Sequence, residues 1–479
     1  MKNKILTLLI VSILIITSLT GCNNIKLSNN PPTDAPVTSN GGLVVQKGDY
    51  LYFANGYVST ESLKNGDNKY GDIKYSAIYR AKTTNSELSY KTVYNDNNEE
   101  EKVLTDVELL IPKVVACENG NFFIFDDYIY YASPTTQKDS TGDSRFDLIT
   151  FFSCKIDGSK TKKLYAVNAY EEGATFNMIK IDGTLYLEVF DGKGITILTI
   201  DGNKVKDTKT IAEGSTLSKV IFPQEETYNA SNNIVNENKG YVYYTRSTTD
   251  KELETDCNVL CRASLKTCEE EILVKQTGIT ITLLDYYNKN IFYTVSASND
   301  PNVDSTFIYA NSAELIKNNL LNNENCISYL ESKNGFYVVK TESFVGKEFV
   351  GAIISNDDGL WLVAKNENAK LIGSKTITVL AVDAKYLYAY DSSNKIVVID
   401  IETGNQLDTS LENDKLYFES AINFDICGTY MYYFNTYEGD EETGYYLNRL
   451  DIADLTGEGE LLGIIDSKYI KTPKEDKED

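Results

Sequence analysis

Short stretches dominated by aromatic and aliphatic residues recur along the chain, each directly after a turn signal. Residues 126–133, Asp-Asp-Tyr-Ile-Tyr-Tyr-Ala-Ser, form one copy, and clear variants lie at residues 49–53, 240–244, 385–389 and 429–433. Aromatic and β-branched residues that alternate in this way after Asp, Asn or Gly predict β-strands packed between other sheets. We therefore expect a chain built from one repeated strand unit.

The spacing of these copies predicts the size of the unit. Turn-plus-strand segments begin near Asp49, Asp127, Asp182, Lys239, Lys289, Asn334, Ala384 and Gly428, and a related hairpin occupies residues 358–362. The intervals are mostly about 45 to 60 residues, which suits a four-stranded propeller blade with its loops. The count predicts an all-β propeller of about eight blades, with seven as the alternative. A closed ring of this kind folds as one body, so the length does not require several domains.

A second motif follows the first in fixed order. Residues 78–84, with Arg80-Ala81, align with residues 260–267, with Arg262-Ala263. Related segments lie at residues 153–158, 198–202, 398–404 and 448–451. Each is an apolar strand that ends in a turn signal and is followed by a further strand. The order predicts that the aromatic strand is the second of each blade and that this strand is the third.

Together the two motifs resemble the β-propellers of bacterial extracellular proteins. The similarity is greatest to the YWTD-like group found in lipoproteins of Gram-positive bacteria as a domain of unknown function, with quinoprotein-like and TolB-like propellers as relatives. It covers residues 41–467 and implies the fold but no particular activity. The single Trp does not match the tryptophan-docking pattern of quinoprotein dehydrogenases.

The N-terminus predicts export and anchoring. Residues 1–21 combine two early lysines with an apolar run at residues 5–16, as in a signal peptide. Residues 19–22, Leu-Thr-Gly-Cys, match the lipobox of bacterial lipoproteins, which implies that Cys22 carries a diacylglycerol. An ordinary secretory signal or an uncleaved anchor are the alternatives. We expect a protein at the outer face of the cytoplasmic membrane that contacts the bilayer through its lipid alone.

These signals divide the chain into four parts. Residues 1–21 are the lipoprotein signal peptide, and residues 22–40 are the lipidated cysteine with a polar, flexible tether rich in Pro, Ser, Thr and Asn. Residues 41–467 form the propeller. Residues 468–479 are a charged tail that we expect to be disordered.

Composition excludes several kinds of function. The net charge of −24 and the pI near 4.6 disfavour nucleic acid as a partner. The chain has no His, so it lacks Ser-His-Asp and Cys-His nucleophile pairs and His-based metal sites. We assign no catalytic residue and no cofactor, and we predict that the protein is not an enzyme. A carboxylate-dependent glycosidase is the alternative, since the chain carries 70 Asp and Glu residues.

Three acidic segments were considered as calcium sites: residues 95–101, 139–147 and 438–442. Residues 139–147 place oxygen donors at regular spacing, but without the full EF-hand pattern and its terminal Glu. We interpret all three as solvated acidic loops and assign no metal site.

Eight cysteines are present, and three of them lie close together. Because an exported protein meets an oxidising environment, we expect a local disulfide that joins Cys257 or Cys261 to Cys268. Cys154 aligns with Cys261 in the repeat and is expected to be a buried strand residue.

Long loops predict where the propeller binds. Insertions between second and third strands fall at residues 55–73, 134–147, 247–256, 296–305 and 436–443, whereas the opposite rim is expected to have short turns. Loops held by a rigid scaffold often carry binding residues, although tolerated insertions are an equal alternative. We expect a ligand-binding or protein-interaction scaffold whose partner is an envelope protein or a cell-surface glycan.

Overall fold

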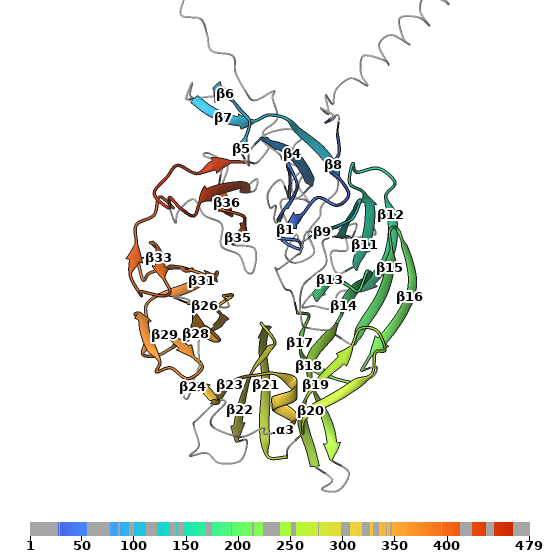
Figure 1. The fold of residues 1–479 in the computed structure, drawn as a ribbon, viewed down its shortest axis with the longest axis vertical. Helices are drawn as coiled ribbons and strands as arrows, with labels where there is room; N and C mark the ends of the chain where they lie inside the picture. The colour runs from blue at the N-terminus through green and yellow to red at the C-terminus, as the bar shows by residue number, and fades with distance from the viewer. Residues whose placement is uncertain are drawn as a thin grey trace, which may run out of the picture.

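Eight four-stranded antiparallel blades form a closed ring in the computed structural model (Figure 1). The structure describes residues 27–462 apart from 28, 55–76, 85–86, 95–99, 112–121, 135–139, 142–147, 169–174, 193, 213–214, 224–239, 251–254, 276, 298–306, 319–325, 329–334, 342, 345–346, 394, 412–423 and 437–444. The all-β fold and the count of eight blades are confirmed, and the alternative of seven is wrong. Within the described ranges, no helix is long and apolar enough to cross a membrane.

Each blade is built from strands that follow one another from the inside of the ring to the outside. Blade 1 contains β2 (Val44–Lys47), β3 (Tyr50–Ala54), β4 (Ile78–Thr84) and β8 (Val107–Ile111), with β1 (Val37–Thr38) on its inner edge. Blade 2 contains β9 (Phe122–Phe125), β10 (Tyr128–Pro134), β11 (Leu148–Lys155) and β12 (Lys162–Asn168). Blade 3 contains β13 (Thr175–Ile181), β14 (Thr184–Phe190), β15 (Ile195–Asp201) and β16 (Lys204–Ile211). Blade 4 contains β17 (Leu217–Ile221), β18 (Tyr241–Asp250), β19 (Thr255–Ser264) and β20 (Glu270–Lys275).

The second half of the ring repeats this order. Blade 5 contains β21 (Ile279–Tyr287), β22 (Asn290–Ala297), β23 (Phe307–Asn311) and β24 (Cys326–Ser328). Blade 6 contains β25 (Gly335–Val338), β28 (Gly351–Asn356), β29 (Gly359–Ala364) and β30 (Lys370–Gly373). Blade 7 contains β31 (Thr378–Val382), β32 (Tyr386–Tyr390), β33 (Ile396–Asp400) and β34 (Gln406–Leu407). Blade 8 contains β35 (Phe424–Cys427), β36 (Tyr430–Thr436), β37 (Tyr445–Asp451) and β38 (Glu460–Leu461).

The core lies between the blades. Eight clusters of buried hydrophobic side chains each join one blade to the next around the ring. Because both faces of a blade are covered, its middle strands are apolar on both sides, as in the fully buried Tyr-Leu-Tyr-Phe-Ala run of β3. The aromatic strands that recur in the sequence are these doubly covered strands.

The order of the two sequence motifs is confirmed in most blades. The aromatic strand is second in blades 1, 2, 4, 7 and 8, and the Arg-Ala or Asp-Gly strand is third. Blade 6 differs, because the segment at Asn334 leads into the first strand and the turn at Asp358 joins the second strand to the third. The hairpin of β26 (Ser343–Phe344) and β27 (Lys347–Glu348) separates the first strand from the second and so shifts the aromatic signal by one strand.

Two faces of the ring can now be defined. The loop face carries the connections between second and third strands, and the turn face carries those between first and second and between third and fourth strands. The expectation of short turns across the whole turn face is wrong. Among the described residues, the turn face also carries the hairpin of β26 and β27 in blade 6, the hairpin of β6 (Tyr90–Tyr94) and β7 (Glu100–Leu104) with the short strand β5 (Glu87–Leu88), and the helix α3 (Ala313–Asn318).

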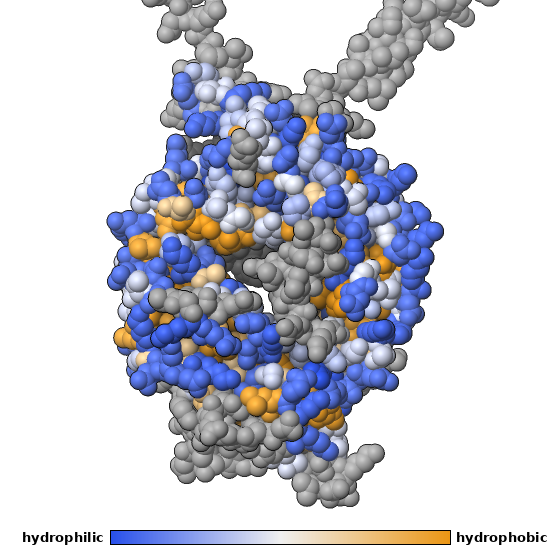
Figure 2. Space-filling model, in the orientation of Figure 1, coloured by the Kyte–Doolittle hydropathy of each residue, from blue (hydrophilic) through white to orange (hydrophobic). Residues whose placement is uncertain are grey.

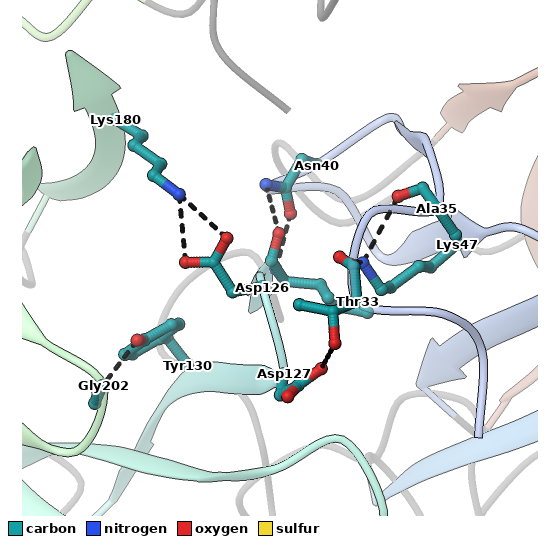
Figure 3. A network of polar contacts seen from close by, with 10 residues as sticks. Thr33, Ala35, Asn40, Lys47, Asp126, Asp127, Tyr130, Lys180 and Gly202 are labelled. Atoms are coloured by element: carbon teal, nitrogen blue, oxygen red, sulfur yellow. Dashed lines mark hydrogen bonds and ion pairs between the residues drawn. The ribbon is translucent and has the colours of Figure 1, made fainter. Parts of the chain in front are cut away.

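The predicted tether ends earlier than residue 40. Residues 29–38, called the strap below, cross the turn face between blades 1 and 2 and enter the ring as β1, which pairs with β2 (Figure 3). The Thr33 hydroxyl donates to Asp127, and the buried Lys47 ammonium donates to the carbonyl oxygens of Thr33 and Ala35. Polar, proline-containing composition suggested flexibility here, but the strap is held because Lys47 of blade 1 bonds to its backbone and Asp127 of blade 2 to the Thr33 side chain.

The ring closes just after the strap. Ser39 Oγ donates to the carbonyl of Ile426 in blade 8, at 2.7 Å, and the Asn40 side chain bonds both backbone groups of Ile124 in blade 2. Gly41 and Gly42 exchange backbone hydrogen bonds with Phe122. Residues 39–42 therefore connect the last blade, the first and the second.

Three blades share a Tyr-Arg-Glu arrangement that explains the Arg-Ala motif. An arginine on the third strand lies directly opposite a glutamate on the fourth strand, with Nε to Oε2 distances between 2.6 and 2.9 Å, and its guanidinium lies 4.0 to 5.3 Å from the centre of a tyrosine ring on the second strand. The triplets are Tyr50, Arg80 and Glu108 in blade 1, Tyr241, Arg262 and Glu271 in blade 4, and Tyr430, Arg449 and Glu460 in blade 8. Each arginine is thus paired with a glutamate carboxylate of its own blade.

Candidate functional site

A cavity of about 740 Å³ opens on the turn face where the inner strands of blades 6, 7 and 8 end. Its walls come from the end of β31 and the following turn, from the turn between β35 and β36, and from Ile452 and Ala453 after β37. Figure 2 shows hydrophobic surface gathered beside the central opening between blades 7 and 8. The volume is within the range of small-molecule sites.

Asp383 fixes one wall of this cavity. Its Oδ1 accepts hydrogen bonds from the backbone N–H groups of Lys385 and Tyr386, each at 2.6 Å, and its Oδ2 accepts one from the Tyr388 hydroxyl at 2.9 Å. Asp383 N in turn donates to the carbonyl of Tyr386. A short side chain that bonds the backbone two and three residues ahead is typical of a tight turn. The turn that joins β31 to β32 is therefore held in one shape.

The opposite wall depends on a glycine. Gly428 lies in the turn between β35 and β36 with a φ of 64°, which residues with a side chain rarely adopt. A Cβ placed there would meet nothing closer than Gln46 Oε1 at 4.0 Å. Backbone conformation, not crowding, therefore favours glycine at this corner.

Two ammonium groups reach the cavity from different blades. Lys340, after the inner strand of blade 6, pairs with Asp285 at 3.0 Å and lies 5.2 Å from the centre of the Tyr287 ring. Lys385 is exposed, and its Nζ lies 4.7 Å from the centre of the Tyr386 ring. A hydrogen bond with Tyr386 and nearby carboxylates raise the pKa of Lys385, so this group keeps its charge at neutral pH. Lys340 is compensated, whereas Lys385 is directed to solvent.

The two tyrosines of β32 have different surroundings. Tyr388 is fully buried, and burial together with the Asp383 carboxylate raises the pKa of its hydroxyl. Tyr386 is half-buried and lines the cavity beside Lys385. Apolar side chains, among them Val382, Ile426 and Ile452, complete the lining. The cavity thus combines an aromatic surface, an available cation and an apolar floor.

Sequence patterns did not identify this cavity, because its residues come from three blades and are brought together only by ring closure. One signal was present. The segment that begins near Ala384 directly follows Asp383, and it has Lys before its first Tyr where the copies at residues 49–53 and 126–133 have Asp.

The cysteines do not form the expected disulfide. Cys257, Cys261 and Cys268 are all free thiols in the structure. Cys268 N donates to the carbonyl of Ser264, at the end of the extended strand β19. At about 3.3 Å per residue, Cys257 is about 23 Å and Cys261 about 10 Å back along that strand, and a disulfide needs Cα atoms within about 7 Å. Cys154 is buried, as expected.

Most other predicted sites lie outside the described residues. This holds for Cys22, for residues 55–73 and for most of the other second-to-third-strand loops. In blade 4, residues 247–250 and 255–256 belong to β18 and β19, so most of the insertion predicted at residues 247–256 is strand. The role of the second-to-third-strand loops as a binding surface stays a prediction. Most of residues 95–101 and 139–147, and all of residues 438–442, are likewise outside the described part.

The sequence matches no protein-family model and no curated protein. Solved structures with a similar fold include the acylaminoacyl peptidase of Pyrococcus horikoshii, which is 10% identical, with a TM-score of 0.41 over 72% of this chain and 52% of that one. The β-propeller domain of the trilobed protease of Pyrococcus furiosus is 9% identical, with a TM-score of 0.35 over 78% and 97%. An oligogalacturonate lyase of Vibrio parahaemolyticus is 11% identical, with a TM-score of 0.37 over 76% and 96%. The chain spans about half the length of the peptidase and of a puromycin hydrolase, and these similarities concern the fold alone.

Proposed function

We propose that this chain is a lipid-anchored, cell-surface propeller that binds a saccharide in the cavity between blades 7 and 8. The observation that carries the proposal is the combination of Tyr386 and Lys385 at the wall of an open cavity of about 740 Å³. A few polar groups on a mainly apolar and aromatic lining are typical of sites that hold small ligands.

A saccharide fits this lining in both of its chemical aspects. Sugar rings present patches of C–H groups that pack on an aromatic face, and hydroxyl groups that exchange hydrogen bonds with charged side chains. Tyr386 supplies the aromatic surface and Lys385 a donor that faces solvent. The ligand we propose is a neutral oligosaccharide of the cell surface, because Asp383, Asp285 and Asp400 lie near the two ammonium groups and offset their charge.

Binding without hydrolysis is the proposed activity. Glycosidases use two carboxyl groups, one of which must exchange a proton or attack the sugar. In the lining, the Asp383 carboxylate already accepts three hydrogen bonds that hold its own turn. This supports a structural role for Asp383. The described lining residues therefore give no specific support to the glycosidase alternative.

The anchor belongs to the same proposal. The signal peptide and Cys22 support export and lipidation, which would place the propeller at the outer face of the cytoplasmic membrane. Leu27, five residues after that cysteine, already contacts the propeller, because its backbone N–H donates to Glu108 of blade 1.

Calorimetric titration tests the proposal. The protein without its lipid, beginning at residue 23, would be titrated with glucose, N-acetylglucosamine and the N-acetylglucosamine dimer and trimer. We expect heat of binding with at least one oligosaccharide and stronger binding for longer chains. No heat with any of them at millimolar concentration would remove the support for a saccharide ligand. Release of reducing sugar during the same incubation would instead favour the glycosidase.

A further inference from the structure

We infer that blade 1 is the membrane-facing edge of the propeller and that the anchor holds this edge within about 20 Å of the lipid surface. The inference rests on the proposed lipidation of Cys22. It identifies the bilayer as the partner of one defined part of the ring, the outer edge of blade 1 beside blade 2. It follows from the way the strap is fixed.

Separation of the strap from the ring would remove the hydrogen-bond acceptors of a buried ammonium group. Lys47 is fully buried, and its ammonium donates to the carbonyl oxygens of Thr33 at 2.8 Å and of Ala35 at 3.3 Å. Burial lowers the pKa of Lys47 below its ordinary value, although nearby carboxylates act in the opposite direction. An ammonium removed from water is costly unless acceptors replace the water, and here the strap supplies acceptors.

Further bonds fix the strap nearer its start. The Tyr50 hydroxyl donates to the carbonyl of Asn29 at 2.7 Å, and Arg80 Nη1 donates to Asn30 Oδ1 at 2.7 Å. Leu27 N donates to Glu108 Oε2 at 3.3 Å, and Glu108 belongs to β8, the outermost strand of blade 1. The chain therefore comes onto the ring at the outer edge of blade 1 and runs inward to β1.

Covalent geometry then limits the distance to the lipid. Cys22 and Leu27 are five residues apart, since 27 − 22 = 5. A fully extended chain spans at most about 3.6 Å per residue, so these residues reach at most about 18 Å. The tether expected from composition, ending at residue 40, would have allowed more than three times that distance. Because the strap is bound to blade 1, only the residues between Cys22 and Leu27 remain to span the distance to the lipid.

The short reach orients the ring. Blade 5 is opposite blade 1 in a ring of eight (Figure 1), so the orientation we infer, with the edge of blade 1 nearest the bilayer, places blade 5 farthest from it. Blade 8 adjoins blade 1, so the cavity between blades 7 and 8 lies on the membrane-proximal half of the ring. Net charge of −24 repels anionic headgroups, so the lipid and not the protein surface provides the attachment.

Energy transfer from the protein to the bilayer tests the orientation. An azide-bearing amino acid would replace either the exposed Lys82 on blade 1 or the exposed Leu315 on blade 5, and each would receive the same donor dye. The full-length lipoprotein would be purified from membranes and placed in phosphatidylcholine vesicles with acceptor-labelled headgroups. We expect efficient transfer from position 82 and weak transfer from position 315. Inserting about 12 Gly and Ser residues after Cys22 should lower the transfer from position 82.

Two failures are distinguishable. Equal transfer from both positions, in protein whose N-terminal peptide carries the lipid mass, would overturn the orientation and leave the proposed anchor intact. Absence of lipid on Cys22, with no association with vesicles, would overturn the anchor and the orientation together. Transfer from position 82 that is unchanged by the insertion would also contradict the inference, because the reach of the tether would then not set the distance.

Discussion

Arg80 and Glu108 lie directly opposite each other on β4 and β8, and both side chains are buried, at 1% and 5% exposed. Arg80 Nε donates to Glu108 Oε2 at 2.9 Å, and its Nη1 reaches Asn30 of the strap. One guanidinium thus joins two strands of blade 1 to the strap.

We expect Glu108→Gln to destabilise the protein by about 3–5 kcal/mol, because it leaves the Arg80 charge buried without its counter-ion. Urea unfolding followed by tryptophan fluorescence measures the loss. Asp201→Asn is the matched control, since Asp201 pairs with Lys206 at 2.9 Å but both are exposed, and the urea midpoint should not move. Equal losses for the two variants would mean that burial of the pair contributes nothing.

At the cavity, Lys385→Ala should weaken binding of the best oligosaccharide about tenfold, which corresponds to about 1.4 kcal/mol. The variant removes both a donor to the sugar and the cation over Tyr386. Lys155→Ala is the control, because Lys155 lies over Tyr128 in the same manner, at 4.1 Å, on blade 2. Titration calorimetry gives both affinities, and a similar loss for Lys155→Ala would place the ligand elsewhere.

Glu188 predicts a pH dependence of stability. It is fully buried between blades 3 and 4, where Asn177 Nδ2 donates to its Oε2 at 2.8 Å and its Oε1 has no hydrogen-bond partner. Burial raises the pKa of Glu188 to about 8, from an ordinary value of 4.5. The folded state therefore keeps a proton that the unfolded state has lost, and the free energy of unfolding should fall between about pH 4.5 and pH 8, by up to about 1.4 kcal/mol per pH unit.

Urea unfolding at pH 5, 6.5 and 8 checks the dependence on Glu188. Glu188→Gln should make the profile flatter across this window, because the amide has no proton to lose. The exposed Glu402→Gln should leave the wild-type profile unchanged. If the slope survives in Glu188→Gln, another group is responsible for it.

Removing the strap should destabilise the propeller. A chain that begins at Gly41 lacks the acceptors used by Lys47, Tyr50 and Arg80, so we expect its melting temperature to fall well below that of a chain that begins at residue 27. Removing residues 468–479 is the control and should have no effect. A chain from Gly41 with an unaltered melting temperature would show that the strap only rests on the ring.

The cysteines give a further prediction. Because none of the six described cysteines forms a disulfide, a reducing agent should leave the melting temperature unchanged. In the native protein, the partly exposed Cys268 and Cys326 should react with iodoacetamide before Cys154 and Cys261. Burial raises the pKa of the Cys154 and Cys261 thiols to about 12, so few of them are thiolates at neutral pH. Peptide mass spectrometry gives the order. A Cys261–Cys268 disulfide in the peptides would contradict the structure.

Local sequence patterns predicted those features of the fold that depend on residues close together in the chain. The segments around Tyr128 and its equivalents predict strands, because a strand covered on both faces is rich in aromatic and β-branched residues. This composition can be recognised in a single sequence. Arg80 and Arg262 were aligned correctly for the same reason, since each occupies the same place in a blade. The shift in blade 6 was missed because a hairpin inserted before β28 leaves the local signal at Gly335 unchanged.

The sequence by itself determined the repeated strand unit and the number of blades, because both depend on residues near one another in the chain. Only the tertiary structure decided three other features: the order in the strap, the separation of Cys257 from Cys268, and the cavity that Lys340 shares with Asp383 and Ile452. Each depends on which distant groups ring closure places side by side. A strap that packs on the ring and a flexible tether can have the same polar composition. What distinguishes them here is the buried Lys47 ammonium, which donates to the carbonyl oxygens of Thr33 and Ala35.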